Sequence, residues 1–182
     1  MAAKDHGQLM KVLIVDGFNV LRSGERYAHL IGDEHALDAL NTAREALLND
    51  VATYAKGTYK ATVVYDGAGN PESSGEARTV AGVDVIFSPA SVSADSVIED
   101  LARQAVNRDE DVLVVTSDAQ TQWTVMRDKV TRMSAAGFCS EMDIIQADIA
   151  RQNDTTLVKT TLGERLDVDI RKTLERWARG QK

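Results

Sequence analysis

Short apolar runs that end at an acidic residue alternate with longer stretches of helical periodicity along this chain. In the first run, four branched aliphatic residues at positions 12–15 stop at Asp16. Continuous apolar runs of this length are typical of strands buried on both faces, as in the parallel sheets of α/β domains. The pattern returns in two later segments, which end at Asp66 and Asp118. We therefore predict buried strands over about 11–16, 60–66 and 111–118.

Two amphipathic stretches separate these strands. Between about 33 and 56, and again between about 93 and 107, apolar residues recur at spacings of three and four, which predicts helices. Asp33 is placed to cap the first turn of the first helix, and either Ser93 or Asp95 could cap the first turn of the second. The alternation of strand and helix predicts an α/β, three-layer domain with a central, mainly parallel sheet. The other predicted elements are a polar loop over 17–32, a turn-rich loop over 67–75, a short strand over 83–87, a helix over 119–128, a strand over 129–134, a helix over 134–152, an extended connector over 153–162 and a basic helix over about 167–179.

Length and composition restrict the kind of protein. The 182 residues fit a single domain, which we expect to span 1–182. No apolar run approaches the ~18 residues that a membrane helix needs, and the first 11 residues lack the apolar centre of a signal peptide. The single cysteine, Cys139, suits a reducing compartment, either as a small buried residue or as a catalytic thiol. These features predict a cytoplasmic protein without a membrane partner.

The charge is unevenly distributed. A net charge of −7 argues against indiscriminate binding of nucleic acid. Residues 1–118 carry a balance of −9, whereas residues 119–182 carry +2. A metal-using enzyme that acts on a polyanion needs both acids for the metal and bases for the substrate. Ordinary solvated helix faces would give the same distribution.

The strand-ending acids carry the candidate chemistry. Asp16, Asp66 and Asp118 each end a predicted strand, and Asp95 opens a helix on which Glu99 lies one turn further along. Taken singly, each aspartate is better explained as a turn or cap residue. If the strands are parallel, however, their carboxyl ends lie side by side at about 4.8 Å, so the carboxylates converge. Crowded carboxylates repel one another unless they share a cation, and oxygen ligands without His or Cys favour Mg²⁺ or Mn²⁺. Such ions activate water and shield phosphate charge in phosphodiester hydrolysis.

Several other chemistries lack their motifs. A haloacid-dehalogenase-type phosphatase needs an aspartate two residues after Asp16, where Phe18 stands. The chain contains neither a phosphate-binding loop of the G-x-x-x-x-G-K-S/T type nor a G-x-S-x-G nucleophile elbow. The glycines at positions 67 and 69 lack the third glycine of a dinucleotide fingerprint. These absences leave metal-assisted hydrolysis as the favoured chemistry.

Several segments resemble the YacP-like branch of the NYN-domain nucleases in order and spacing: residues 13–19, 64–66, 93–99, 114–118, 132–135 and 174–180. The resemblance covers about 11–180. It implies a fold related to the PIN and 5′-nuclease domains, with a Mg²⁺ or Mn²⁺ site built from aspartates. It further implies an endoribonuclease, and in the best-known bacterial member one that acts on messenger RNA in association with translating ribosomes.

The resemblance also implies roles for residues at matching positions. Asp16, Asp95 and Asp118 would be the principal catalytic and metal-binding acids, with Asp66 joining the metal set. Asn19 would orient water or substrate, Glu99 would support the acids, and Ser117 with Thr116 would shape the loop that holds Asp118.

Five basic residues near the acids are candidate phosphate contacts: Arg22, Arg26, Arg127, Lys129 and Arg132. Any one of them, taken singly, is better explained as solvated surface charge. The hypothesis is therefore a metal-dependent ribonuclease. The alternatives are a non-catalytic RNA- or ribosome-binding module of the same fold and a small-molecule phosphohydrolase. The converging acids favour an enzyme, because a pure binding module has no need of them.

Overall fold

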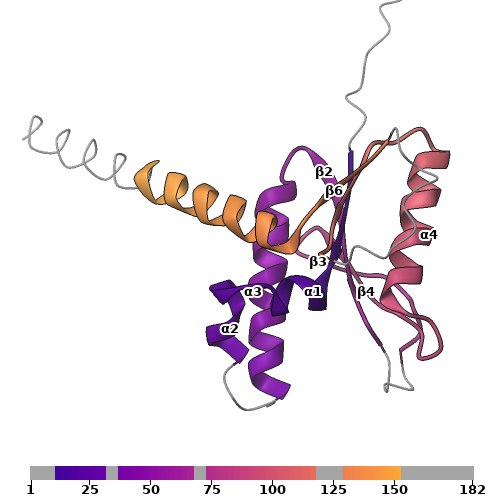
Figure 1. Ribbon diagram of the computed structural model, residues 1–182, viewed down its shortest axis with the longest axis horizontal. Coiled ribbons are helices and arrows are strands. Elements are labelled where there is room, and N and C mark those ends of the chain that lie inside the picture. The colour runs from indigo at the N-terminus through magenta and orange to yellow at the C-terminus, as the bar shows by residue number, and fades with distance from the viewer. Residues whose placement is uncertain (1–10, 32–36, 68–72, 118–128, 153–182) are drawn as a thin grey trace, which may run out of the picture. The chain divides into compact units, whose positions relative to one another are not determined.

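The computed structural model describes residues 11–31, 37–67, 73–117 and 129–152 (Figure 1). The chain divides into two compact units, residues 1–142 and 143–182. The described part of the second unit is helical throughout. The elements in chain order are β1 (Lys11–Asp16), α1 (Gly17–Arg22), α2 (Glu25–Ile31), α3 (Leu37–Ala55), β2 (Tyr59–Tyr65), β3 (Arg78–Val80), β4 (Val83–Phe87), α4 (Ala94–Asn107), β5 (Val112–Val115), β6 (Val130–Met133) and a helix over residues 135–152.

The strands form one six-stranded sheet in the order β3-β4-β2-β1-β5-β6. Strand β1 lies in the middle and pairs in parallel with both β2 and β5. Strands β4 and β6 extend the parallel sheet on either side, and only the β3–β4 pair is antiparallel. The three strands predicted from their acid-ending runs are therefore neighbours, and the predicted mainly parallel α/β fold is confirmed. Their carboxyl ends form the lower edge of the sheet in Figure 1.

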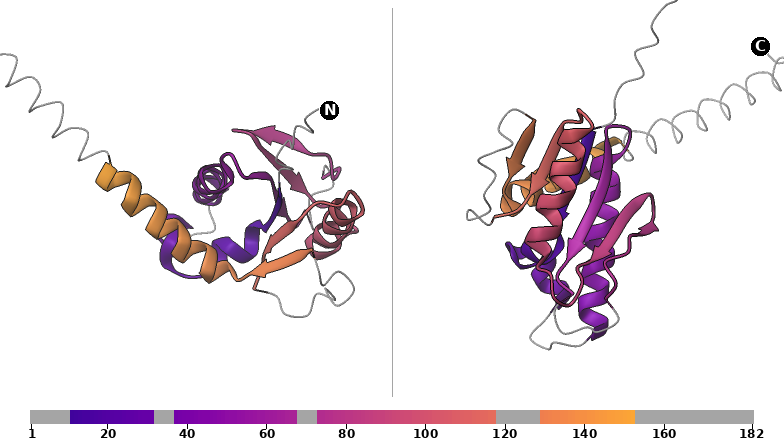
Figure 2. Two further views of the ribbon diagram at one scale, coloured as in Figure 1. Left: turned by 90° about the horizontal axis from the view of Figure 1, so that it is seen from above. Right: turned by 90° about the vertical axis from the view of Figure 1, so that its right-hand side faces the viewer.

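Helices cover both faces of the sheet. Helix α4 packs its small and aliphatic residues, such as Ile98 and Ala102, against Val12, Ile14 and Val114. Side chains alternate between the two faces of a strand, so the intervening residues of β1 face the opposite layer. Figure 2 shows α3 on that opposite side, and α3 buries Leu47 and Val51 completely, while α1 and α2 contact α3. Strands β1, β2 and β5 are thus buried on both faces over most of their length, as their continuous apolar runs predict.

The segment after β1 differs from the prediction. Residues 17–32 were expected to form a polar loop, and this expectation is wrong because α1 and α2 occupy most of the segment. These helices have six and seven residues, too few to display a helical period in the sequence. They are held by burial of Val20, Leu21 and Tyr27 instead, each at most 1% exposed.

Smaller differences concern strand ends. Strand β3 was not predicted, because its three residues are all exposed and carry no alternating pattern. Strand β5 ends at Val115 rather than at position 118, and the backbone N–H of Thr116 donates to the carbonyl of Met133 at 3.0 Å. The predicted strand over 83–87 is confirmed, as is the cap of α4, where Ser93 Oγ accepts from the N–H of Ser96.

Some predicted elements fall outside the described residues. These are the start of the helix predicted from position 33, the helix over 119–128, the connector over 153–162 and the basic helix over 167–179. Among the described residues, no helix combines the length and the apolar character that crossing a membrane requires.

Candidate functional site

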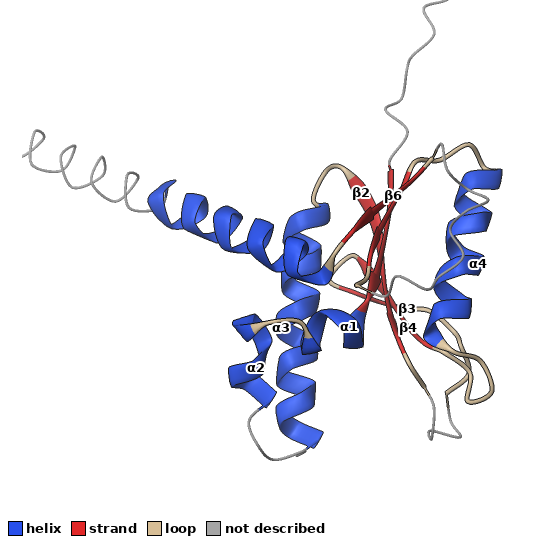
Figure 3. Cartoon of the chain, viewed as in Figure 1, coloured by secondary structure: helices blue, strands red, loops and turns tan. Residues whose placement is uncertain are grey.

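A cleft of about 1510 Å³ opens where β1, β2 and β4 end. In Figure 3 the loop that follows β4 extends from this lower edge of the sheet. Asp16, Asp66 and Asp95, three of the four predicted metal ligands, line the cleft. Asn19 and Ser117 line it as well. The carboxyl ends of the parallel strands therefore bring together acids that are far apart in the sequence.

Asp16 is fixed in place by the start of α1. Its carboxylate caps the helix by accepting from the backbone N–H of Asn19 at 3.0 Å, and the residue is only 9% exposed. Gly17 allows α1 to begin directly at the sheet edge, since a Cβ at this position would lie 2.2 Å from the ring of Tyr65. A carboxylate has two oxygens with about four lone-pair directions, so a capping bond is compatible with metal coordination.

Asn19 connects the end of β1 to the end of β5. Its Oδ1 accepts from the backbone N–H of Ser117 at 2.9 Å. Ser117 Oγ in turn accepts from the N–H of Ala135 at 3.2 Å. The donor to Asn19 is an N–H, which identifies the accepting atom as oxygen and leaves the amide nitrogen as a donor toward other groups. The loop after β5 is thereby anchored at Ser117, and Asp118, the next residue, lies outside the described residues.

The remaining predicted acids differ in exposure. Asp95 stands in the first turn of α4 and is half-buried at the cleft. Asp66 directly follows β2 and is exposed. Glu99 lies one turn further along α4 and is half-buried, but it is not among the residues that line the cleft.

The donor set of the cleft consists of carboxylate oxygens, which fits Mg²⁺ or Mn²⁺ by its chemistry. Within the described ranges, no three acidic, histidine or cysteine side chains form a group that could hold a metal ion. The predicted set includes Asp118, which falls outside those ranges. The described acids therefore supply only part of the predicted metal site.

The predicted phosphate contacts occupy different places. Arg22 lines the cleft and is exposed, with its guanidinium carbon 5.4 Å from the ring centroid of Phe18. Arg132 is exposed on β6 and does not line the cleft. Lys129 forms an ion pair with Asp109, and it immediately precedes β6, at the opposite edge of the sheet from the acids. Arg127 lies outside the described residues.

Arg26 takes part in a buried cluster between α2 and α3. Its Nε donates to Asp50 Oδ2 at 2.8 Å, and the two side chains are 12% and 10% exposed. The hydroxyl of Tyr27 donates to the same oxygen at 2.7 Å. The bond to Asp50 raises the pKa of Arg26, and burial raises the pKa of Tyr27. This cluster joins the two helices, and Arg26 is not among the residues that line the cleft.

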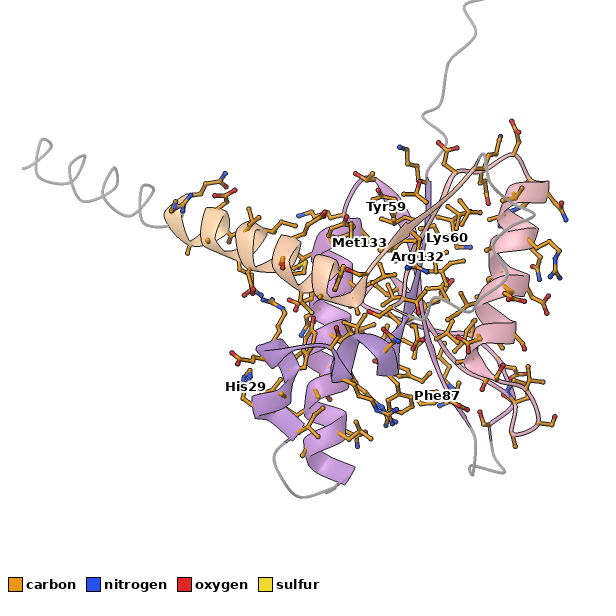
Figure 4. All side chains as sticks on the ribbon, in the orientation of Figure 1. His29, Tyr59, Lys60, Phe87, Arg132 and Met133 are labelled. Carbon is orange, nitrogen blue, oxygen red and sulfur yellow. The ribbon has the colours of Figure 1, made fainter. Side chains whose placement is uncertain are left out.

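Arg44 and the aromatic rings around it were not predicted from the sequence. Arg44 extends from α3 into the cleft, where its guanidinium lies over Phe18, Tyr65 and Phe87. Figure 4 labels Phe87 near the lower edge of the sheet, and Tyr59 and Lys60 near the upper edge where β2 begins. One signal was available, because Tyr65 is the second-to-last residue of one predicted strand, Phe87 ends another and Phe18 lies two residues after a third. Their convergence with a helical arginine had no sequence pattern of its own.

Comparison with known proteins identifies the family. The YacP-like NYN domain matches residues 13–179 of the chain. The chain belongs to this family. It is 28% identical over 172 residues to the protein named uncharacterized protein YacP of Bacillus subtilis (strain 168), with 94% of this chain and 98% of that protein covered.

Solved structures agree with this assignment. The YacP-like chain is similar to the crystal structure of Rae1 (YacP) from Bacillus subtilis, with a TM-score of 0.64 at 28% identity over 94% of this chain and 96% of that one. A tryptophan-to-leucine variant of the same protein gives a TM-score of 0.61 at 28% identity over 81% and 85% of the two chains. Membership in the YacP-like NYN family supports a nuclease-type function that involves RNA.

Proposed function

We propose that this protein is a Mg²⁺- or Mn²⁺-dependent endoribonuclease that hydrolyses phosphodiester bonds of RNA. One observation carries the proposal: Asp16, Asp66 and Asp95 line a single cleft at the carboxyl ends of parallel strands. The hydrogen bond from Ser117 to Asn19 supports the addition of Asp118, because it anchors the preceding residue at the same cleft. The chain belongs to a nuclease-type family, and phosphodiester hydrolysis is a reaction in which a cluster of acids can take part by binding a metal ion.

Asp16, Asp95 and Asp118 would hold the metal, with Asp66 as a further ligand. Bound there, the ion would lower the pKa of a water molecule and neutralise charge on the scissile phosphate. Asp16 would present its carboxylate to the metal in a fixed orientation, because the hydrogen bond from Asn19 N–H limits rotation of the side chain. Glu99 would support Asp95 from the next turn of α4.

Asn19 would contact the substrate or the attacking water through its amide nitrogen. Its oxygen accepts from Ser117, so the N–H groups are the donors that remain for a phosphate oxygen or a water. Hydrogen bonds to an ionised acceptor are stronger than neutral ones, which suits contact with a phosphate. Asn19 would thus position the reacting groups and hold the loop of Asp118 with the same side chain.

Basic residues would guide the RNA into the cleft that contains the acids. Arg22 lines the cleft, and Arg127 and Arg132 belong to the segments that follow β5. We further propose messenger RNA on translating ribosomes as the substrate, in the cytoplasm. The family resemblance is the support for these finer assignments.

The test is a cleavage assay with purified protein and uniformly labelled single-stranded RNA. With Mn²⁺ we expect internal fragments, and with EDTA we expect intact RNA. A non-catalytic binding module would retain RNA in a filter-binding assay without cutting it at any metal concentration. A phosphohydrolase would release phosphate from p-nitrophenyl phosphate and leave the RNA intact. Either of those results would contradict the proposed activity.

A further inference from the structure

An arginine is held over three aromatic rings inside the acidic cleft. The guanidinium carbon of Arg44 lies 5.3 Å from the ring centroids of Phe18, Tyr65 and Phe87. We call these three residues the aromatic clamp. The clamp rings also contact one another, since Tyr65 stacks on Phe87 at 5.3 Å and meets Phe18 edge to face at 5.4 Å. Four separate elements, α1, β2, β4 and α3, therefore converge to fix one cationic side chain.

Arg44 has no carboxylate partner in the part of the chain that the structure describes. Its Nη1 donates to Asn41 Oδ1 at 3.1 Å, and its buried Nε has no hydrogen-bond partner among the described residues. Burial lowers the pKa of Arg44. Arg26 shows the contrast, because its guanidinium pairs with Asp50 at 2.8 Å. A half-buried cation without a counter-charge is costly, so an anionic ligand in the cleft would offset that cost.

The geometry suits a phosphate group. Cation–π contacts hold the flat face of a guanidinium while its N–H donors remain in the plane, where they match two phosphate oxygens. The same cleft contains Asp16, Asp66 and Asp95, which repel an RNA backbone wherever a cation does not intervene. A rigidly held arginine that lines the same cleft as these acids would therefore determine where the polyanion can approach.

We propose that Arg44, held by the aromatic clamp, binds a backbone phosphate of the RNA next to the scissile one and so positions the scissile bond at the acids. This inference rests on the proposed ribonuclease function and adds a substrate-positioning residue to it. The clamp supplies rigidity, so that little side-chain entropy is lost when the phosphate binds.

Binding of RNA tests the inference separately from cleavage. The parent for all measurements is Asp16→Asn with EDTA present, so that a short fluorescein-labelled single-stranded oligoribonucleotide stays intact. Arg44→Met keeps an unbranched apolar side chain over the rings and removes the charge. We expect affinity to fall at least about tenfold at low salt. A plot of the logarithm of the association constant against the logarithm of the salt concentration, measured between about 50 and 200 mM, should also have a slope that is less negative by about 0.7. A purely structural role would leave this slope unchanged.

Arg103→Met is the matched control. Arg103 pairs with Asp100 on α4, is 58% exposed and does not line the cleft, so its loss should leave the slope unchanged. Equal affinity and slope for Arg44→Met and its parent would overturn the inference. If this occurs while the wild type cleaves RNA, the inference alone fails. A wild type that neither binds nor cleaves RNA would overturn the proposed function as well.

A scan of the RNA gives a second, independent measurement. Each phosphate is replaced in turn by a neutral methylphosphonate, and binding to the parent and to Arg44→Met is compared. We expect one position at which neutralisation weakens binding to the parent but not to the variant. If Arg44→Met shows no cooperative thermal unfolding, Arg44→Lys replaces it, and the coupling at that position should fall because lysine lacks the planar fork. Uniform sensitivity along the RNA in the parent would contradict a specific Arg44–phosphate contact.

Discussion

The side-chain oxygen of Asn19 accepts a hydrogen bond from the backbone N–H of Ser117, 98 residues further along the chain, at 2.9 Å. Asn19 belongs to α1, which follows β1, whereas Ser117 belongs to the loop that follows β5. The backbone N–H of Asn19 itself donates to Asp16. One residue thus couples the first acid of the cleft to the loop that leads into Asp118.

This coupling predicts a separation of stability from activity. In Asn19→Asp the new carboxylate can still accept the hydrogen bond from Ser117. The substitution removes the amide N–H donors, however, and adds a negative charge to the cleft. We expect a free energy of unfolding within about 0.5 kcal/mol of wild type and a strong loss of Mn²⁺-dependent RNA cleavage. Asn19→Ala should lose cleavage and about 1 kcal/mol of stability together. Asn49→Ala, at an exposed position of α3, is the control. Wild-type cleavage by Asn19→Asp would contradict a role for the amide.

Gly17 should tolerate no side chain. Gly17→Ala places a Cβ 2.2 Å from the Tyr65 ring, so α1 or the ring has to shift. We expect a loss of about 1–3 kcal/mol in denaturant unfolding. Combining it with Tyr65→Leu should recover part of the loss, which a double-mutant cycle measures. Gly137→Ala is a suitable comparison within a helix, because the nearest atom to its added Cβ would be Ser134 Oγ at 3.1 Å, a far less severe contact than at Gly17. Additive effects of the first two substitutions would argue against the contact.

The buried cluster of Arg26, Tyr27 and Asp50 predicts a stability effect without a binding effect. Arg26→Met removes the guanidinium that pairs with Asp50 and keeps the hydrogen bond from the Tyr27 hydroxyl to the same carboxylate. Breaking such a buried pair on one side costs about 3–5 kcal/mol, and we expect a loss near the lower end. At a temperature where the variant is folded, its affinity for single-stranded RNA should equal that of wild type. An affinity loss comparable to that of Arg44→Met would show that Arg26 contacts the substrate.

Two buried tyrosines predict how stability depends on pH. Burial raises the pKa of Tyr27 and that of Tyr65 above the ordinary value of 10. The folded protein therefore keeps these protons when the unfolded chain begins to lose them. The contribution of each neutral tyrosine to the free energy of unfolding is complete below pH 10. It declines as the pH rises further, by about 1.4 kcal/mol per pH unit for each tyrosine. Urea unfolding at a series of pH values measures the slope, and Tyr27→Phe with Tyr65→Phe should flatten it. An equal slope in the double variant would contradict the assignment.

The sequence predicted those parts of the fold that depend on local pattern. Residues 12–15 form a continuous apolar run, and burial on both faces allows no polar residue there, so strand β1 and its acid were recognisable. Helices α1 and α2 were missed because their stability comes from burial of Val20 and Tyr27 against other elements rather than from their own periodicity.

The candidate site likewise contains residues that local sequence pattern predicts and residues that it does not. Asp16 and Asp66 follow from the rule that parallel strands end at one edge. Arg44 does not follow from any such rule, because its environment consists of rings from three other elements. Arg26 was grouped with the phosphate contacts because its partner Asp50 is 24 residues away in sequence, and their contact depends on how α2 packs on α3.

The most direct test of the account is RNA cleavage by Asp16→Asn with Mn²⁺. Asparagine is as good a helix cap as aspartate, so the start of α1 and the thermal unfolding transition should be preserved. Removal of the charge should abolish cleavage of single-stranded RNA. Asp100→Asn, an exposed change on α4 outside the cleft, should cleave like wild type. Full activity of folded Asp16→Asn, purified free of contaminating nuclease, would contradict the assignment of this cleft as a metal-dependent active site.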